Sequence, residues 1–321
     1  MDNNKNTNEK NTNKDVISNL PDHILHEFLV RMPLRNAVRT SVLSREWRDK
    51  WKYIQELVLN KDSGFFYRYH DHQFRIYQLL FNHRAQIRKF SLAVPPFMRL
   101  STIDLLILCL SRNHLVCDFT LAPYVMDNYI MPSHFYAFRK LAVVRLSRCT
   151  LISPPQFQGF STLVKIEFQE VQFLPGAFER FISRCPCLES LYLSSKTINM
   201  DSLEVAGPSL RIFACHGFVK TIHFKSCPVL AQLWQKGWDA NVLEMIQEQE
   251  TPNPYLNQLK KIELHCYSGT FHQTALLKYL LTSATGLEYM VIVPASNYKP
   301  SVDLRVQTME YPWASPAARL I

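Results

Sequence analysis

The chain has 321 residues, of which 47% are hydrophobic and 20% are charged, and it is long enough for two or three domains or one elongated repeat domain. This composition is ordinary for a folded protein and excludes a chain that is disordered throughout. The longest apolar run, Leu105 to Leu110, is too short to cross a bilayer as a helix.

The formal net charge of +9 raises the question of a nucleic-acid partner. More than half of the excess lies between Arg31 and Lys52, where seven Arg and Lys residues face only Glu46 and Asp49 as acidic residues. These charges alternate with apolar residues at helical spacing, which is typical of the solvated face of amphipathic helices. A nucleic-acid interface is therefore disfavoured, although it stays as an alternative function.

The eight cysteines are scattered and form no CxxC motif, which excludes a zinc ribbon and a thioredoxin-like site. Without a secretory signal, we expect free thiols in a reducing compartment, so the expected location is the cytoplasm, the nucleus or both. Residues 1–14 are dominated by Asn, Lys and Thr, and we expect them to be a disordered tail.

The segment after this tail predicts three short helices. Pro21 is placed to open the first helix, and Pro33 stops it and opens the second. Ser44 is the expected N-cap of a third helix, which would present Trp47 and Trp51 on one face. Such a small module has more apolar surface than it can bury alone, so it must dock on the rest of the chain or on another protein.

From residue 87 a second pattern predicts a leucine-rich-repeat solenoid. The pattern apolar-x-x-apolar-x-apolar recurs at intervals of 22 to 29 residues in the first six matches and 28 in the last two, which are leucine-rich-repeat periods. A sequence typical of a capping box at 101–104 predicts the start of a helix between strands. The segment 219–224 falls out of phase and predicts an irregular or doubled strand. The eight matches begin at Ile87, Val116, Leu141, Leu163, Leu188, Leu210, Leu259 and Leu287.

Catalytic and metal-binding signatures do not accompany these repeats. The chain contains no GxGxxG, GxxxxGK[ST] or GxSxG motif, which removes the structural basis for nucleotide binding and for a serine-hydrolase elbow. His23, His26 and Glu27 give the order HxxHE instead of HExxH, so a solvated helix face is the better interpretation. We therefore expect no catalytic residue, no metal and no cofactor.

The segment ISNLPDHILHEFLVRMPLRNAVRTSVLSREWRDKW, from Ile17 to Trp51, closely resembles an F-box of the plant type. The remainder resembles the plant F-box/FBD/LRR family, with CPCLESLYL matching its repeats and the segment 259–292 matching its FBD region. The resemblance implies a non-catalytic substrate receptor of an SCF-type (cullin-RING) ubiquitin ligase. The F-box would bind a Skp-type adaptor, and through it cullin and RING subunits, while the repeats would hold a protein for ubiquitination.

The resemblance also implies which F-box residues dock on the adaptor. Leu20, Pro21, Ile24 and Leu25 open the motif at its exposed end, so we expect these four residues to face the adaptor. The alternative is that they pack inside the module. The two tryptophans have a second interpretation, in which they join the module to the first repeat through Tyr53, Leu57 and Leu59. The set comprises Leu20, Pro21, Ile24, Leu25, Leu29, Met32, Pro33, Ala37, Val38, Val42, Leu43, Trp47 and Trp51.

On the repeats, the period of two along a strand places every second side chain on the concave face of the sheet. Charges of both signs and aromatic residues occur there, which suits a protein partner better than a polyanion. The predicted target-binding positions are Lys89, Asp118, Arg145, Lys165, Glu167, Tyr192, His216, Lys261, Glu263 and Tyr289.

The predicted fold class is α/β: a three-helix F-box followed by an irregular leucine-rich-repeat solenoid, with a parallel sheet and helices on its convex side. Three rival functions stay open: repeats that bind a small molecule to complete a protein-binding surface, a nucleic-acid binder or non-ligase scaffold, and a degenerate receptor without a target. The expected organisation is a tail at 1–14, the F-box at 15–60, a connecting segment at 61–86, repeats at 87–236, a linker at 237–257 and FBD-like repeats at 258–321.

Overall fold

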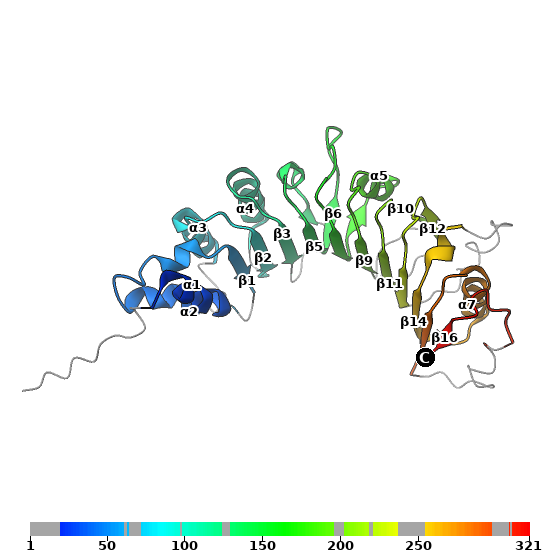
Figure 1. Cartoon of the computed structure of the whole chain (residues 1–321). Coiled ribbons are helices and arrows are strands. Elements are labelled where there is room, and N and C mark those ends of the chain that lie inside the picture. Colours follow the sequence, from blue (N-terminus) through cyan, green and yellow to red (C-terminus); the bar gives the residue numbers. More distant parts are fainter. Residues whose placement is uncertain are drawn as a thin grey trace, which may run out of the picture.

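The structure is a computed structural model, and it describes residues 20–60, 63, 72–96, 98–123, 129–195, 202–217, 221–236, 254–296, 308 and 310–321. The predicted tail at 1–14 lies outside these residues, as does most of the predicted linker, of which 254–257 are described. The chain forms an arch with a small group of helices at its N-terminal end (Figure 1). The predicted α/β class, with helices followed by a parallel repeat sheet, is confirmed.

The N-terminal helices differ from the prediction at the third one. Pro21 and Pro33 stand immediately before the first two α-helices, as their fixed φ angles favour. Residues 45–49 form turns instead of the predicted helix, and Ser44 caps nothing because its hydroxyl has no hydrogen-bond partner. The elements are α1 (Asp22–Arg31), α2 (Leu34–Arg39), and the 3-10 helices η1 (Thr40–Val42) and η2 (Lys50–Tyr53).

One parallel sheet of eleven strands runs through the whole arch and forms its concave face (Figure 1). Each repeat strand begins two residues after a buried aliphatic residue, such as Leu141, Leu163 or Leu188, whose exposed fractions are at most 1%. In sheet order, the strands are β1 (Glu56–Leu59), β2 (Lys89–Val94), β3 (Asp118–Pro123), β5 (Val143–Ser147), β7 (Lys165–Gln169), β9 (Ser190–Ser195), β11 (Ile212–Gly217), β13 (Gln232–Lys236), β14 (Lys261–Tyr267), β15 (Tyr289–Pro294) and β16 (Arg319–Leu320).

The same backbone hydrogen bonds recur at the start of successive repeats. At each junction, two consecutive N–H groups donate to one carbonyl of the preceding repeat: those of Val164 and Lys165 to Ala142, and those of Glu189 and Ser190 to Val164. This ladder fixes the register, so corresponding side chains of neighbouring repeats lie beside one another. β13 pairs directly with β14, and the sheet therefore continues without a break into the C-terminal repeats.

Helices and short strands together cover the convex side of the sheet (Figure 1). The predicted capping box is wrong, because α4 begins before it and Arg99 takes the N-cap position. The out-of-phase segment forms β12, which pairs with β10 in a separate small sheet. The elements outside the main sheet are α3 (His72–Asn82), α4 (Leu100–Asn113), β4 (Tyr129–Ile130), η3 (Ser133–Ala137), β6 (Cys149–Leu151), β8 (Gln172–Phe173), α5 (Ala177–Ser183), β10 (Ser202–Ala206), β12 (Thr221–Lys225), η4 (Pro254–Gln258) and α7 (Phe271–Ser283).

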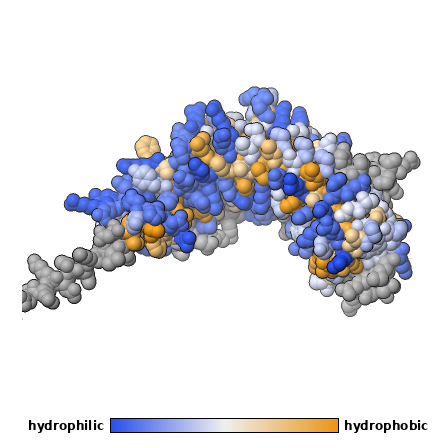
Figure 2. Space-filling view, in the orientation of Figure 1, coloured by the Kyte–Doolittle hydropathy of each residue, from blue (hydrophilic) through white to orange (hydrophobic). Residues whose placement is uncertain are grey.

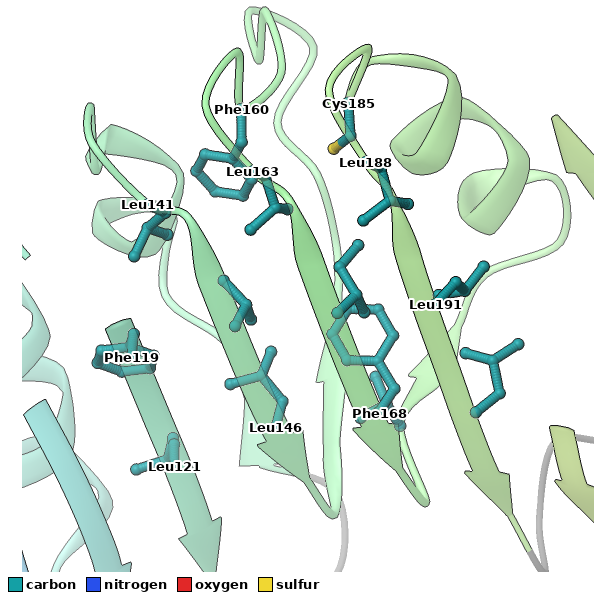
Figure 3. Close-up of a cluster of buried hydrophobic side chains, with 14 of the residues drawn as sticks. Phe119, Leu121, Leu141, Leu146, Phe160, Leu163, Phe168, Cys185, Leu188 and Leu191 are labelled. Atoms are coloured by element: carbon teal, nitrogen blue, oxygen red, sulfur yellow. The ribbon is translucent and has the colours of Figure 1, made fainter. Parts of the chain in front are cut away.

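A stack of apolar side chains between the two layers forms the core. In Figure 3, Leu141, Leu163 and Leu188 take the same place on neighbouring repeats and point toward the convex layer. Phenylalanines extend the stack from one repeat to the next: the ring centroids of Phe135 and Phe160 are 5.6 Å apart, and those of Phe160 and Phe181 are 6.0 Å apart. Burial of this stack against neighbouring repeats is the main stabilising term for a solenoid.

Candidate docking surfaces

Five of the thirteen residues predicted to meet an adaptor lie in the core instead of on the surface. The α1 pair Leu25 and Leu29 turns inward, and each is only 1% exposed. Leu25 was expected to face the adaptor, and this placement corrects that expectation, because the side of α1 that carries Leu25 packs on the rest of the module. The five buried residues are Leu25, Leu29, Ala37, Trp47 and Trp51.

The two tryptophans join the helical module to the solenoid. Trp47 is 4% exposed and Trp51 is 8% exposed, and both belong to the core cluster that contains Leu57 and Leu59 of β1. The turns at 45–49 allow both indoles to enter this core. The prediction that Tyr53 also takes part in this junction is wrong, since Tyr53 is 47% exposed and its hydroxyl faces Arg84.

Other apolar residues of the module remain in contact with water. Val42 is 86% exposed and Leu43 is 68% exposed, at the end of α2 and η1. Figure 2 shows hydrophobic residues gathered on the helical end of the arch, over α1 and α2. Pro21 and Pro33 are also exposed, whereas Leu20, Ile24, Met32 and Val38 are half-buried.

Phe28 is another exposed apolar residue of the module, and it was not among the predicted docking residues. It is 51% exposed, and it lies one helical turn after Ile24 on α1. The i, i+4 spacing from Ile24 was the signal in the sequence that places Phe28 on this face of the helix. Exposed valine, leucine and phenylalanine side chains on one small module are what a protein-docking surface requires.

The ten predicted target-binding positions all lie on strands of the main sheet, and all are half-buried or exposed. The register places Lys89 beside Asp118 and Lys261 beside Tyr289 on adjacent strands. It also aligns Arg145, Glu167 and Tyr192 across β5, β7 and β9. Whether these residues bind a target stays a prediction.

The charged positions of β3, β5 and β7 neutralise one another. Arg145 lies 2.8 Å from an Asp118 carboxylate oxygen and 3.3 Å from Glu167, and Lys165 lies 2.7 Å from Glu167. The Lys165 ammonium also lies 4.8 Å from the centre of the Tyr192 ring. Half-exposed pairs of this kind contribute only about 0–1 kcal/mol each to stability. Because these positive and negative side chains are paired, this part of the concave sheet has no electrostatic field of a single sign. It therefore does not favour a polyanion as a partner.

An aromatic cluster follows on β11, β13 and β14, and its central residue is Trp234. The Trp234 ring lies 5.3 Å from the His265 ring and 6.4 Å from the His216 ring, measured between centroids. Glu263 lies 3.3 Å from His265. A hydrogen bond from Lys261, and then one from His265, holds the pKa of Glu263 below its usual value. We call His216, Trp234 and His265 the Trp234 cluster.

Trp234 was not predicted because β13 does not match the repeat pattern. In the sequence LAQLWQ, Gln235 occupies the position where the pattern requires an apolar residue. The structure nevertheless buries Gln235, which is 5% exposed, and the alternation then turns Trp234 to the concave face. Tryptophan is enriched among the residues that dominate binding energy at protein interfaces.

In the part of the chain that the structure describes, no group of three or more His, Cys, Asp or Glu residues could hold a metal ion. Nor do the described helices include one that is long and apolar enough to span a bilayer.

The helical module, the repeat sheet and the C-terminal repeats define an F-box protein with leucine-rich repeats, and comparisons with known families agree. The F-box domain model matches residues 17–58, the model of the LRR repeats of FBD-associated F-box protein At5g56370 matches 114–253, and the FBD model matches 247–292. The chain thus carries an F-box, LRR repeats and an FBD segment, the three features in the name of the F-box/FBD/LRR-repeat proteins.

Named relatives come from Arabidopsis thaliana. F-box/FBD/LRR-repeat protein At1g13570 is 31% identical over 226 residues, which cover 68% of this chain and 53% of that protein. FBD-associated F-box protein At4g10400 is 28% identical over 61% of this chain and 49% of its own length. F-box protein At4g09920 is 23% identical over 94% of this chain and 92% of its own length. The chain thus aligns with about half the length of the first two relatives.

Proposed function

We propose that the chain is the substrate-recognition subunit of an SCF-type ubiquitin ligase, in which the F-box binds a Skp-type adaptor and the repeats hold a target protein. The observation that carries this proposal is the match of residues 17–58 to the F-box together with the apolar side chains that this module leaves exposed. In such a complex the chain itself catalyses nothing. Cullin and RING subunits would join through the adaptor.

The adaptor would cover the exposed apolar residues Phe28, Val42 and Leu43. Complete burial of a valine or leucine side chain is worth about 1.5–3 kcal/mol. Val42 and Leu43 retain 86% and 68% of their exposure in the free chain. Their burial would therefore contribute about 2–5 kcal/mol in total to adaptor binding, by the same area relation.

Isothermal titration of the full chain with a purified Skp-type adaptor tests the proposal. We expect the double variant Val42→Asp/Leu43→Asp to bind at least about 30-fold more weakly than the wild type, since each tenfold change corresponds to about 1.4 kcal/mol. Phe81→Asp is the matched control, because Phe81 is 94% exposed on α3, outside the F-box module, and its substitution should leave the affinity unchanged. No binding by the folded wild type would refute the receptor role and would return the module to a scaffold function.

The concave sheet would hold the target, with the Trp234 cluster as its central contact. The ion pairs along β3, β5 and β7 leave no uniform positive field, so a protein with a mixed surface fits this face better than a nucleic acid. All eight cysteines are free, and this supports the proposed location in the reducing cytoplasm or nucleus. Once a target is identified, Trp234→Ala should weaken target binding and leave adaptor binding intact.

A further inference from the structure

A cavity of about 280 Å³ lies between the F-box module and the first helix of the convex layer. Its walls come from three elements: α2, η2 and α3. Two apolar side chains, Val38 and Leu79, form part of its surface. The other lining residues carry hydrogen-bond donors, and they are Arg35, Arg39, Trp51, Arg75, Gln78 and Asn82.

Three arginines are among the residues that line this cavity, and no Asp or Glu is among them. Arg35 and Arg39 are one turn apart on α2, so they share a face of the helix. Arg75 reaches the same cavity from α3. Within the described part of the chain, neither Arg39 nor Arg75 forms an ion pair, which contrasts with the ion-paired arginines of the concave sheet.

We propose that this cavity binds a small phosphorylated metabolite. A phosphate dianion would accept hydrogen bonds from the guanidinium groups, whose planar fork matches phosphate oxygens in a bidentate manner. The ring or carbon skeleton of the ligand would lie on the apolar part of the wall, against Trp51, Val38 and Leu79.

The size of the cavity supports a small ligand. Small-molecule pockets have volumes of about 300–1,000 Å³, and this cavity lies at the lower limit of that range. The buried indole of Trp51 and the buried side chain of Leu79 give it a fixed floor, because both belong to the core. Arg39 and Arg75 are exposed, so an anion can reach their side chains from solution.

A ligand in this cavity would connect two parts of the protein. Arg35 and Arg39 belong to the F-box module, whereas Arg75 belongs to the first helix over the solenoid. An anion shared between them would hold the F-box module at one angle to the repeat sheet. This inference concerns the chain alone and does not rest on its role in a ligase.

Titration of phenyl phosphate into the full-length chain at low ionic strength tests the site, with inorganic phosphate and phenol as companion probes. We expect saturable binding of one phenyl phosphate, weaker binding of inorganic phosphate because it lacks the ring, and none of phenol because it lacks the charge. The variant Arg39→Gln/Arg75→Gln should bind phenyl phosphate at least about 30-fold more weakly, since one hydrogen bond to a charged group is typically worth about tenfold or more.

The matched control is Arg112→Gln/Arg139→Gln, which removes the same charge from exposed positions that do not line the cavity. It should change the affinity by less than about twofold, because neither side chain lines the cavity and so neither can donate a hydrogen bond to the bound phosphate. Melting curves establish that all variants fold. Absence of saturable binding to the folded wild type, or an equal loss in both double variants, would overturn the proposal. Adaptor binding is measured separately, so a negative result here leaves the receptor role untouched.

Discussion

Gly159 permits a close approach between two repeats, and its replacement provides a sharp test of the packing. Its φ of +103° lies where residues with a side chain are strained, and an added Cβ would overlap the carbonyl oxygen of Arg184. The Arg184 guanidinium in turn donates to the carbonyl of Phe157, so the two loops hold each other in place.

The cost of Gly159→Ala has two parts. A side chain at positive φ costs about 1–2 kcal/mol, and overpacking that forces a backbone to move costs about 1–3 kcal/mol. Gly176→Ala is the matched control, because Gly176 also has a positive φ, +65°, but an added Cβ would meet nothing within 4 Å. We expect Gly159→Ala to lose about 2–5 kcal/mol of unfolding free energy and Gly176→Ala about 1–2 kcal/mol.

Urea unfolding followed by circular dichroism measures both variants against the wild type. Both glycines have a positive φ, so the comparison removes most of the backbone cost and leaves mainly the contact with Arg184. Equal losses of stability in the two variants would show that the close approach contributes nothing, and the reasoning would fail.

Two further predictions concern titrating side chains. Burial raises the pKa of Cys149 to about 12, so its thiol should react slowly with iodoacetamide at pH 8. Mass spectrometry should show that the exposed Cys187 and Cys266 are modified first. Equally rapid labelling of Cys149 would contradict its burial. Burial, and then the neighbouring His114, lowers the pKa of His83 to about 4 from 6.5, so the unfolded chain binds the proton more tightly. The free energy of unfolding should therefore fall as the pH drops from 6.5 toward 4, and it should fall less steeply in the variant His83→Gln. Urea titrations at several pH values measure this, and identical pH profiles for the wild type and the variant would refute it.

The repeat strands could be predicted because burial on one face imposes a strict alternation on each of them. Eight strands follow the apolar-x-x-apolar-x-apolar pattern, and in each the strand begins at the third position of the pattern. β13 was missed since Gln235 replaces an apolar residue, and the small sheet of β4, β6 and β8 was missed since strands of two or three residues carry no readable period.

The F-box surface could be predicted only in part. The positions of Pro21 and Pro33 fixed two helices, because proline restricts the backbone locally. The sequence could not separate Leu25, which is buried, from Val42, which is exposed, because both are aliphatic residues at helical spacing. That distinction depends on η2 and β1, which follow later in the F-box segment and pack against α1 and α2 respectively.

The F-box module also covers one end of the solenoid. Among the strands that the structure describes, β1 pairs only with β2, and its inward side chains Leu57 and Leu59 share a core with the F-box residues Leu25 and Trp51. An unprotected terminal repeat of a solenoid exposes its core and a free strand edge, both of which promote aggregation. A truncated chain without its F-box would therefore lose its N-terminal cap as well. Point substitutions at Val42 and Leu43 are the cleaner way to test the proposed adaptor contact, because they leave the end of the solenoid covered.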